Sequence, residues 1–579
     1  MDVNGAVVTR VNGPVVEVSG GEGLAMLDLV HVGAKQLPGE VIALDGGNAT
    51  VQVYAYTGGL KPGEEVVGSG GPLAVELGPG LLGGVFDGVL ARLDGAGTRI
   101  ASESATTTLD RSRVWRFSPG VDAGAALTGG TVLGTLQESG AIEHRVLVPP
   151  EAGGTLDWIA PAGDYRVGET VACLGRLELG LSQRWPVRRP RPTSARLEAQ
   201  EPLITGQRVL DSLFPVARGS TAAVPGGFGT GKTVLLQQIA KWSDAAVIVY
   251  IGCGERGNEL ADVLGEFEAL EDPRTGQSLL DRTVLIANTS NMPVMAREAS
   301  IYTGVTVAEY FRDMGHDAVV IADSTSRWAE ALRELASRTD ELPAEEGYPA
   351  GLSSALAEFY ERAGRVQTLA GAVASITVVG AVSPPGGDLT EPVTAHTRRF
   401  VRSVWSLDRD LAYARHYPAV SWRDSSARDT DRLSTWQAEH GDPGWGARRA
   451  HALQLLTDAD RIDQIAQLVG ADSLPAPERV TLSSARLLRE VVLQQSAVLD
   501  NDQYSSPAKQ RALLALVLDL HNRRIELLER GVSAVEVESL DLSEVRRARY
   551  DTPPDGANEV ERIGRELMAA LDAAGGAHE

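Results

Sequence analysis

Cysteine is scarce in this sequence, because the 579 residues include only Cys173 and Cys253. Two cysteines cannot form a framework of several disulfides or a four-cysteine zinc site. The simpler expectation is a reducing compartment, where structural disulfides are rare. The nine histidines show no metal-ligand spacing, so no transition metal held by protein ligands is expected.

Positive charge and long apolar runs are also scarce. The chain has 54 Lys and Arg residues against 77 Asp and Glu residues, which is a formal net charge of −23. Proteins that bind nucleic acid usually show a basic balance or stripe, so no nucleic-acid partner is expected. No stretch reaches the roughly 18 apolar residues of a membrane-spanning helix. The first residues, MDVNGAVVTRVNGPVVEV, lack the basic region and apolar core of a signal peptide.

The N-terminal third of the chain is rich in strand patterns, within a total length that predicts about four domains. Residues 1–70 alternate apolar and polar side chains between Gly and Pro turns, which predicts an N-terminal β-barrel. Residues 71–109 are interpreted as a connector, with a short helix expected within 72–93. Residues 110–185 alternate again and predict a β-rich insertion. The basic segment WPVRRPRPTS, 185–194, fits either a plain linker or a structured contact at the rim of the next domain.

The rest of the chain changes character twice. Between 186 and 435, apolar runs such as AAVIVYIG and DAVVIADS alternate with helical patterns, which favours a parallel sheet in an α/β domain. From 436 to 579 helical spacing dominates, with Gly531 expected just after a helix end. The predicted fold class is therefore a multidomain α/β protein with a P-loop (RecA-like) domain and a C-terminal helical domain.

The strongest motif is PGGFGTGKT, 225–233, which matches the phosphate-binding pattern G-x-x-x-x-G-K-[ST]. It follows the predicted strand STAAV and precedes the helical run VLLQQIAKW, as such a loop requires. Lys232 would reach the β- and γ-phosphates, and the Thr233 hydroxyl would take one Mg²⁺ position. The alternative is a glycine-rich turn that binds nothing. The predicted nucleotide-binding residues of the loop are Gly226, Gly227, Phe228, Gly229, Thr230, Gly231, Lys232 and Thr233.

Two carboxylates follow other apolar runs. Asp323 ends DAVVIAD, where a P-loop ATPase carries its Mg²⁺-site aspartate, although it could instead cap the next helix. Glu255 ends VIVYIGCGE, and Arg256 follows it. A carboxylate at this edge of a parallel sheet could orient the water that attacks a γ-phosphate. Arg256 would then place positive charge near the phosphates. The alternative for these two residues is a surface ion pair of little energetic value.

Long strings of the sequence are familiar beyond these motifs. They include GGFGTGKT, YIGCGERGNE, SNMPVMAREASIYTGVTVAEYFRDMGHDAVVIADSTSRWAEALRE, EEGYPAGLSSALAEFYERAGRV and GAVSPPGGDLTEPVT. Over essentially its whole length, the chain resembles the catalytic A subunits (alpha chains) of the V/A-type rotary ATPases. The insertion at 110–185 resembles the bulge domain of those subunits. Two departures stand out, since the family usually has Pro in place of Gly227 and Ser in place of Thr230.

The resemblance implies an activity and a set of partners. It implies hydrolysis or synthesis of Mg-ATP, with ATP or ADP and Mg²⁺ bound, coupled through a rotating stalk to proton or sodium transport. It implies an alternating hexamer with non-catalytic B subunits, which supply an arginine finger. Central and peripheral stalk subunits and a membrane sector complete the complex, at the cytoplasmic face of the cell membrane. Two rivals are a hexameric nucleic-acid motor and a non-catalytic nucleotide-binding subunit.

The resemblance also implies residue roles. By motif, 226–233 would bind phosphates, Glu255 would activate water, Arg256 would assist at the γ-phosphate, and Asp323 would hold the Mg²⁺ shell through water. Tyr417, in HYPAVSW, occupies the position of an aromatic residue that packs against adenine. Its alternative is plain core packing of a Tyr-Pro turn. The following segment, RDSSARDTDRLSTW, differs from the more aromatic family pattern.

Overall fold

The computed structural model describes residues 5–93, 108–140, 142–272, 275–338, 342–470 and 473–576. The chain divides into two compact units, each assembled from separate stretches of sequence. The first unit comprises Met1–Glu198, Ala245–Val382 and Thr390–Phe400. The second unit comprises Ala199–Asp244, Ser383–Leu389 and Val401–Glu579.

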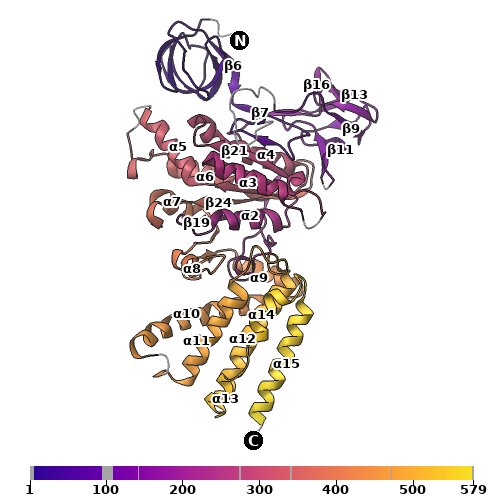
Figure 1. Cartoon of the computed structure of the whole chain (residues 1–579). Helices are drawn as coiled ribbons and strands as arrows, with labels where there is room; N and C mark the ends of the chain where they lie inside the picture. Colours follow the sequence, from indigo (N-terminus) through magenta and orange to yellow (C-terminus); the bar gives the residue numbers. More distant parts are fainter. Residues whose placement is uncertain are drawn as a thin grey trace. The chain divides into compact units, whose positions relative to one another are not determined.

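The N-terminal strands of the first unit form a closed antiparallel barrel, drawn in indigo in Figure 1. Their order in the sheet is β1-β2-β5-β4-β3-β6. The ends of the sheet meet where Val66 N donates to Ala6 O at 2.8 Å. Alternate valines fill the interior, which explains the period-two pattern of the sequence. The strands are β1 (Val7–Asn12), β2 (Val15–Ser19), β3 (Asp28–Val32), β4 (Leu37–Asp45), β5 (Asn48–Val53) and β6 (Val66–Pro72).

The helix expected within residues 72–93 is absent, and that prediction is wrong. The segment instead contributes β7 (Ala74–Leu77), which pairs with β17 (Gln183–Pro186), and β8 (Val85–Phe86), which pairs with β21 (Thr283–Thr289). Gly83 has φ +75°, a left-handed conformation that interrupts a right-handed helix. The apolar side chains are buried because the segment lies between sheets, and a helical stripe is not needed for that.

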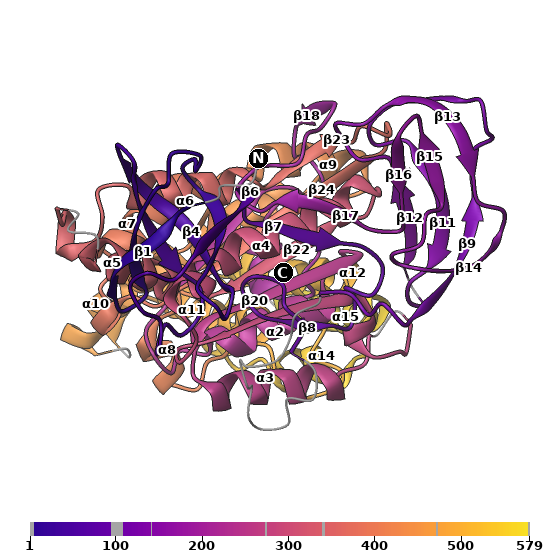
Figure 2. The same ribbon diagram turned by 90° about the horizontal axis from the view of Figure 1, so that it is seen from above.

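The β-rich insertion forms two four-stranded sheets, seen as one cluster of purple strands in Figure 2. One sheet has the order β10-β13-β15-β16 and the other β12-β11-β9-β14. Glu138 and His144 anchor the second sheet, because His144 Nδ1 lies 2.6 Å from Glu138 Oε2 and its Nε2 lies 3.0 Å from the Tyr310 hydroxyl. The strands are β9 (Val114–Pro119), β10 (Ala126–Leu127), β11 (Val132–Gln137), β12 (Glu143–Leu147), β13 (Gly154–Ile159), β14 (Gly163–Arg166), β15 (Ala172–Leu174) and β16 (Leu177–Leu179).

A buried parallel sheet is the core of the first unit. Its parallel strands run in the order β24-β22-β20-β21-β8, with β23 antiparallel to β24. Every residue of β20 except the last is buried, which accounts for its unbroken apolar sequence. The strands are β18 (Ala195–Leu197), β20 (Val247–Glu255), β22 (Ala318–Asp323), β23 (Gly364–Gln367) and β24 (Val373–Val382). The helices are α3 (Gly257–Ala269), η1 (Leu279–Arg282), α4 (Val294–Asp313), α5 (Thr325–Arg338), η2 (Glu345–Gly347), α6 (Leu352–Glu361) and α7 (Pro392–Phe400).

The segment 185–194 is structured, not a plain linker. Arg188 Nη2 lies 2.9 Å from Glu40 Oε2 in the barrel and 2.8 Å from Glu298 Oε2 in α4. Arg191, which is buried, donates from Nε to Asp313 Oδ2 at 2.6 Å. Both arginines therefore fasten this stretch to α4, and Arg188 also fastens it to the barrel.

The second unit combines a small strand group with the C-terminal helices. Strand β19 (Thr221–Pro225) is parallel to β25 (Ser403–Val404), which pairs with β26 (Ser426–Ala427). Helices α1 (Arg208–Leu213), α2 (Lys232–Trp242) and α8 (Arg409–Tyr413) and the short helix η3 (Pro385–Gly387) accompany these strands. None of the described helices of the chain is long and apolar enough to cross a membrane.

The C-terminal helices lie side by side, with α11 against α10 and α12, and α12 against α15 (Figure 1). Leu487, Leu488, Val491 and Val492 are buried, as their spacing predicts. Helix α12 ends at Glu529, and Gly531 follows with φ +86°, the predicted helix-ending position. The helices are α9 (Thr430–Glu439), α10 (Trp445–Val469), α11 (Ala476–Leu488), the π-helix η5 (Arg489–Leu493), α12 (Pro507–Glu529), α13 (Ala534–Glu538), α14 (Ser543–Asp551) and α15 (Ala557–Gly576).

Replacing Arg188 with Ala should destabilise the first unit strongly. The change leaves the carboxylates of Glu40 and Glu298 buried without their shared cation, a situation that costs about 3–5 kcal/mol. Thermal unfolding of the full chain measures the effect as a lower midpoint. Arg189→Ala is the matched control, because the Arg189–Glu151 pair on the same segment is exposed and is worth about 0–1 kcal/mol. Equal midpoints for the two variants would contradict this account.

Candidate functional site

The predicted site residues belong to both compact units. The phosphate loop and Tyr417 are in the second unit, whereas Glu255, Arg256 and Asp323 are in the first.

The phosphate loop connects the buried strand β19 to α2, which begins at Lys232. The Lys232 ammonium points back at the loop, since Nζ donates to Gly226 O at 2.6 Å and to Gly227 O at 3.0 Å. The Thr230 hydroxyl donates to Gly227 O at 2.8 Å and closes the loop on itself. The Lys232 ammonium can exchange these two carbonyl contacts for a phosphate group. A loop in this conformation, with its lysine directed inward, can therefore hold phosphate.

The first turn of α2 suits an anion. It contains no acidic side chain, so nothing in that turn opposes the positive end of the helix dipole. Thr233 is exposed in that turn, where its hydroxyl can serve a hard cation such as Mg²⁺. Phe228 is 94% exposed, so its ring stands open to solvent at the loop. The residues present therefore fit a phosphate group with its Mg²⁺.

Tyr417 lies against the last glycine of the loop. Gly231 has φ +86°, and a side chain there would place its Cβ 3.4 Å from Tyr417 Cε1. The tyrosine is 42% exposed, which does not fit its alternative interpretation as plain core packing. Its main-chain carbonyl is fixed, because Gln495 N donates to Tyr417 O at 2.8 Å. An accessible aromatic face beside a phosphate loop can stack on a nucleotide base.

In the first unit, Glu255 and Asp323 end neighbouring parallel strands. Glu255 is the last residue of β20 and Asp323 the last residue of β22, and Gly252 is the register partner of Asp323. Asp323 is buried and accepts a hydrogen bond from the Tyr250 hydroxyl at 3.1 Å. The carboxyl edge of a parallel sheet is where such folds bind ligands.

The environment of Glu255 raises its pKa to about 8. Burial is the main cause, and the negative charge of Asp323 and a hydrogen bond with Glu259 act in the same direction. The Arg327 guanidinium opposes them in part. A carboxyl group whose pKa lies near neutrality is suited to proton transfer, and surface carboxyls do not have this property.

The ion pair between Glu255 and Arg256, the alternative interpretation of this sequence, is not formed in the described part of the chain. Arg256 is exposed and stands immediately before α3 as its N-cap residue. The arginines next to the turn are Arg297 and Arg327. A Cβ on Gly254 would lie 2.9 Å from Arg327 Cβ and 3.0 Å from Arg297 Cδ. Only glycine fits at position 254, because a side chain would meet these two arginines and because a φ of +73° strains any other residue.

Sequence reasoning missed Arg327, Arg297 and Glu259. Arg327 had a usable signal, since it stands four residues after Asp323, in the first turn of the next helix. Glu259 is likewise four residues after Glu255, in the first turn of α3. Arg297 is far from both in sequence and reaches Gly254 only because α4 packs on β20.

Comparison with known proteins covers almost the whole chain. Four family descriptions match: the "ATP synthase alpha/beta family, beta-barrel domain" at 8–70, its "barrel-sandwich domain" at 106–188, its "nucleotide-binding domain" at 206–427, and the "C-terminal domain of V and A type ATP synthase" at 434–533. The solved structure of the assembled ATPase EscN of an E. coli type III secretion system has a similar fold. Its TM-score is 0.64 at 21% identity, over 89% of this chain and 100% of that one.

Curated relatives are similar over nearly their full length. The V-type ATP synthase alpha chain of Nitrosococcus oceani is 50% identical, over 98% of each chain. The A subunit of the A-type ATP synthase of Hyperthermus butylicus is 48% identical, over 99% of this chain and 98% of the relative. That of Methanosarcina barkeri is 50% identical, over 95% and 96%. Together with the barrel, the phosphate loop and the C-terminal helices, these matches show that the chain belongs to the ATP synthase alpha/beta family, in its V- and A-type branch.

Proposed function

We propose that the chain is the catalytic subunit of a V/A-type rotary ATPase, which hydrolyses or synthesises Mg-ATP. The observation that carries the proposal is the pair of carboxylates, Glu255 and Asp323, that end the neighbouring parallel strands β20 and β22. Burial and the charge of Asp323 raise the pKa of Glu255 to about 8, which suits this residue to exchange a proton with water. The relatives, which are alpha chains and A subunits of ATP synthases, support the same activity.

Each group of residues has its own role in the proposed activity. The loop residues 226–233 hold the phosphates through main-chain N–H groups and Lys232, and Tyr417 packs against the base. Thr233 and Asp323 offer the hydroxyl and carboxylate oxygens that Mg²⁺ prefers. When bound, Mg²⁺ neutralises charge on the phosphate oxygens.

Hydrolysis then needs a water held in line with the γ-phosphate. Glu255 orients this water and accepts its proton. Lys232, Arg256 and the loop N–H groups stabilise the negative charge that spreads over the phosphoryl oxygens. Synthesis uses the same groups in reverse, with Glu255 returning the proton.

The proposed partners follow from the family. Non-catalytic B subunits alternate with this chain in a hexamer and supply an arginine finger, and central and peripheral stalk subunits link it to a membrane sector that moves protons or sodium ions. The chain would then be a peripheral part of a membrane-bound complex, at the cytoplasmic face of the cell membrane. The proposed division of the chain is 1–70, 71–109, 110–185, 186–435 and 436–579.

Two rival functions are less well supported. A hexameric nucleic-acid motor would be expected to carry a basic surface, and this chain has a net charge of −23. A non-catalytic nucleotide-binding subunit would have no need of a proton-exchanging Glu255. Replacing Glu255 therefore separates that rival from the catalytic proposal.

Replacing Glu255 with Gln should stop hydrolysis and spare binding. The amide cannot accept a proton, so kcat of the A–B complex should fall by about 10²–10⁴-fold. Calorimetry should give an MgADP affinity close to that of the unchanged chain. Lys232→Ala is the companion variant and should lose tight nucleotide binding instead. Normal turnover in the Glu255→Gln variant would show that this carboxylate is not the base.

Hydrolysis should increase with pH through the pKa of Glu255. Below about pH 8 the carboxyl group holds a proton and cannot take one from water, and above it the carboxylate is ready to act. A profile of kcat/KM against pH for the A–B complex should therefore rise and then level off. Because the hydrogen bond between Glu255 and Glu259 and the charge of Glu259 both raise the pKa of Glu255, Glu259→Ala should move the midpoint to lower pH. The same midpoint in both proteins would argue against this coupling.

The isolated chain should be a poor ATPase. An arginine finger adds about 10³–10⁵-fold to turnover in sites of this kind, and here the finger belongs to the B subunit. Turnover should be measured with the purified chain alone and after addition of purified B subunit. Fast multiple turnover by the chain alone would rule out a finger in trans.

A further inference from the structure

The Tyr417 turn is attached to the loop that follows η5 through two adjacent glutamines. Gln495 N donates to Tyr417 O at 2.8 Å, and Gln494 Nε2 donates to Arg415 O at 3.4 Å. Between these contacts lies His416, whose pKa burial lowers to about 4, so its ring is neutral and adds no charge to the turn. The position of Tyr417 therefore depends on where residues 494 and 495 are held.

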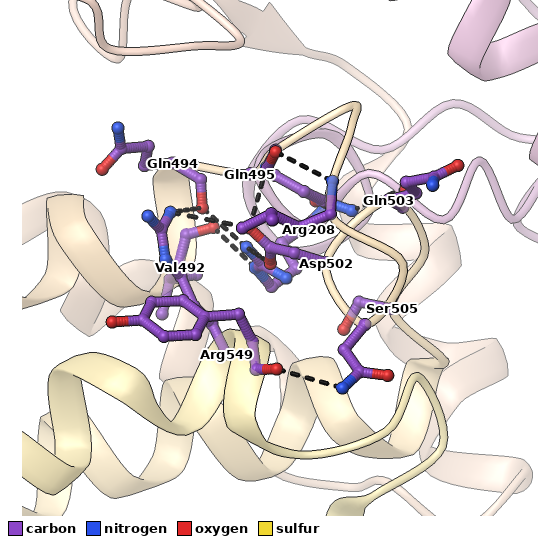
Figure 3. Close-up of polar contacts among 12 residues, drawn as sticks. Arg208, Val492, Gln494, Gln495, Asp502, Gln503, Ser505 and Arg549 are labelled. Carbon is purple, nitrogen blue, oxygen red and sulfur yellow. Dashed lines mark hydrogen bonds and ion pairs between the residues drawn. The ribbon is translucent and has the colours of Figure 1, made fainter.

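The Gln495 side chain forms hydrogen bonds with the segment at the start of α1 and with the loop after η5. It is buried, and its Oε1 accepts a hydrogen bond from Arg208 N at 2.8 Å. Its Nε2 donates to Gly206 O at 2.9 Å and to Gln503 O at 3.2 Å. One residue thus holds the Tyr417 turn with its main chain and the start of α1 with its side chain, as Figure 3 shows for the side-chain contacts.

A buried ion pair fixes the same segment. Arg208 Nη2 donates to Gln494 O at 2.6 Å and lies 2.7 Å from Asp502 Oδ1, and both charged side chains are fully buried. Arg549, from α14, donates to Gln494 O at 2.8 Å, so this carbonyl accepts from two guanidinium groups (Figure 3). A buried pair of this kind contributes little net stability but allows few alternative geometries.

We propose that Gln495 is a positioning residue for the nucleotide base. It links α1, the buried Arg208–Asp502 pair and the Tyr417 turn, and so sets where the accessible tyrosine ring stands beside Gly231 of the phosphate loop. Weakening these contacts therefore moves the ring and changes base affinity, while the phosphate contacts stay as they are. The inference rests on the proposed function, because it takes Tyr417 as the residue that packs against the base.

The test replaces Gln495 with Glu in the full chain. The carboxylate keeps the acceptor for Arg208 N but faces Gly206 O and Gln503 O with an oxygen where an N–H stood. Loss of such hydrogen bonds should weaken MgADP binding about fivefold and raise KM for ATP equally, with kcat of the A–B complex within about twofold. Binding of magnesium tripolyphosphate, which has phosphates but no base, should be unchanged.

The control is Gln503→Ala on the same loop. The Gln503 side chain contacts Lys241, Val498 and Asp500, whereas only its main-chain carbonyl accepts from Gln495. This variant should bind MgADP and tripolyphosphate as the unchanged chain does. If Gln495→Glu fails to fold, as judged by its thermal midpoint, Gln495→Met removes the same donors, and the acceptor as well, without adding a charge, and the same outcomes are expected.

A double-mutant cycle with Tyr417→Ala decides whether Gln495 acts through the ring. In the Tyr417→Ala chain, adding Gln495→Glu should cause no further loss of MgADP affinity. A full additional loss, or equal weakening of ADP and tripolyphosphate, would overturn the positioning role. Lys232→Ala distinguishes failure of the proposed function from failure of the role of Gln495. If Lys232→Ala still binds MgADP and tripolyphosphate, the proposed function fails. If it binds neither ligand, and Gln495→Glu changes the affinity of neither, only the role of Gln495 fails.

Discussion

The burial of two carboxylates at the ends of adjacent strands, together with the repulsion between them, is the constraint on which the candidate chemistry depends. Parallel pairing of β20 with β22 brings Glu255 and Asp323 to one edge, and burial of both strands removes the water that would screen their charges. Asp323 is held in place by Tyr250. Burial and the charge of Asp323 raise the pKa of Glu255 to about 8, which makes this group suited to proton transfer.

Buried arginines hold separate elements of each unit in fixed positions. Arg188 joins the barrel to α4, and Arg208 joins α1 to the loop that follows η5. Apolar packing is not directional, whereas a guanidinium with several donors accepts only a few arrangements of its partners. Two adjacent residues of helix α4 make these contacts: Arg297 lies against Gly254, and Glu298 binds Arg188.

Much of the fold and part of the candidate site could be predicted from sequence, because the signals were local. The buried strands, the phosphate loop and the stripe Leu487, Leu488, Val491 and Val492 each follow from spacing within about a dozen residues. The helix expected within 72–93 failed because its apolar residues belong to β7 and β8, which are buried by partners distant in sequence. Arg297 and Gln495 were missed for the same reason, since each acts on a turn that packing alone brings near it.

The sequence by itself determined the buried strands, the C-terminal helices, the family, and which carboxylates end apolar strands, because periodicity and motifs are properties of contiguous residues. Only the tertiary structure decided which charges those carboxylates face. It placed Arg327 and Glu259 at Glu255 and left Arg256 exposed before α3. It also showed that the basic segment 185–194 is fastened to α4. The physical reason is that pKa values and ion pairs depend on distance and burial, and these arise only when segments far apart in the chain pack together.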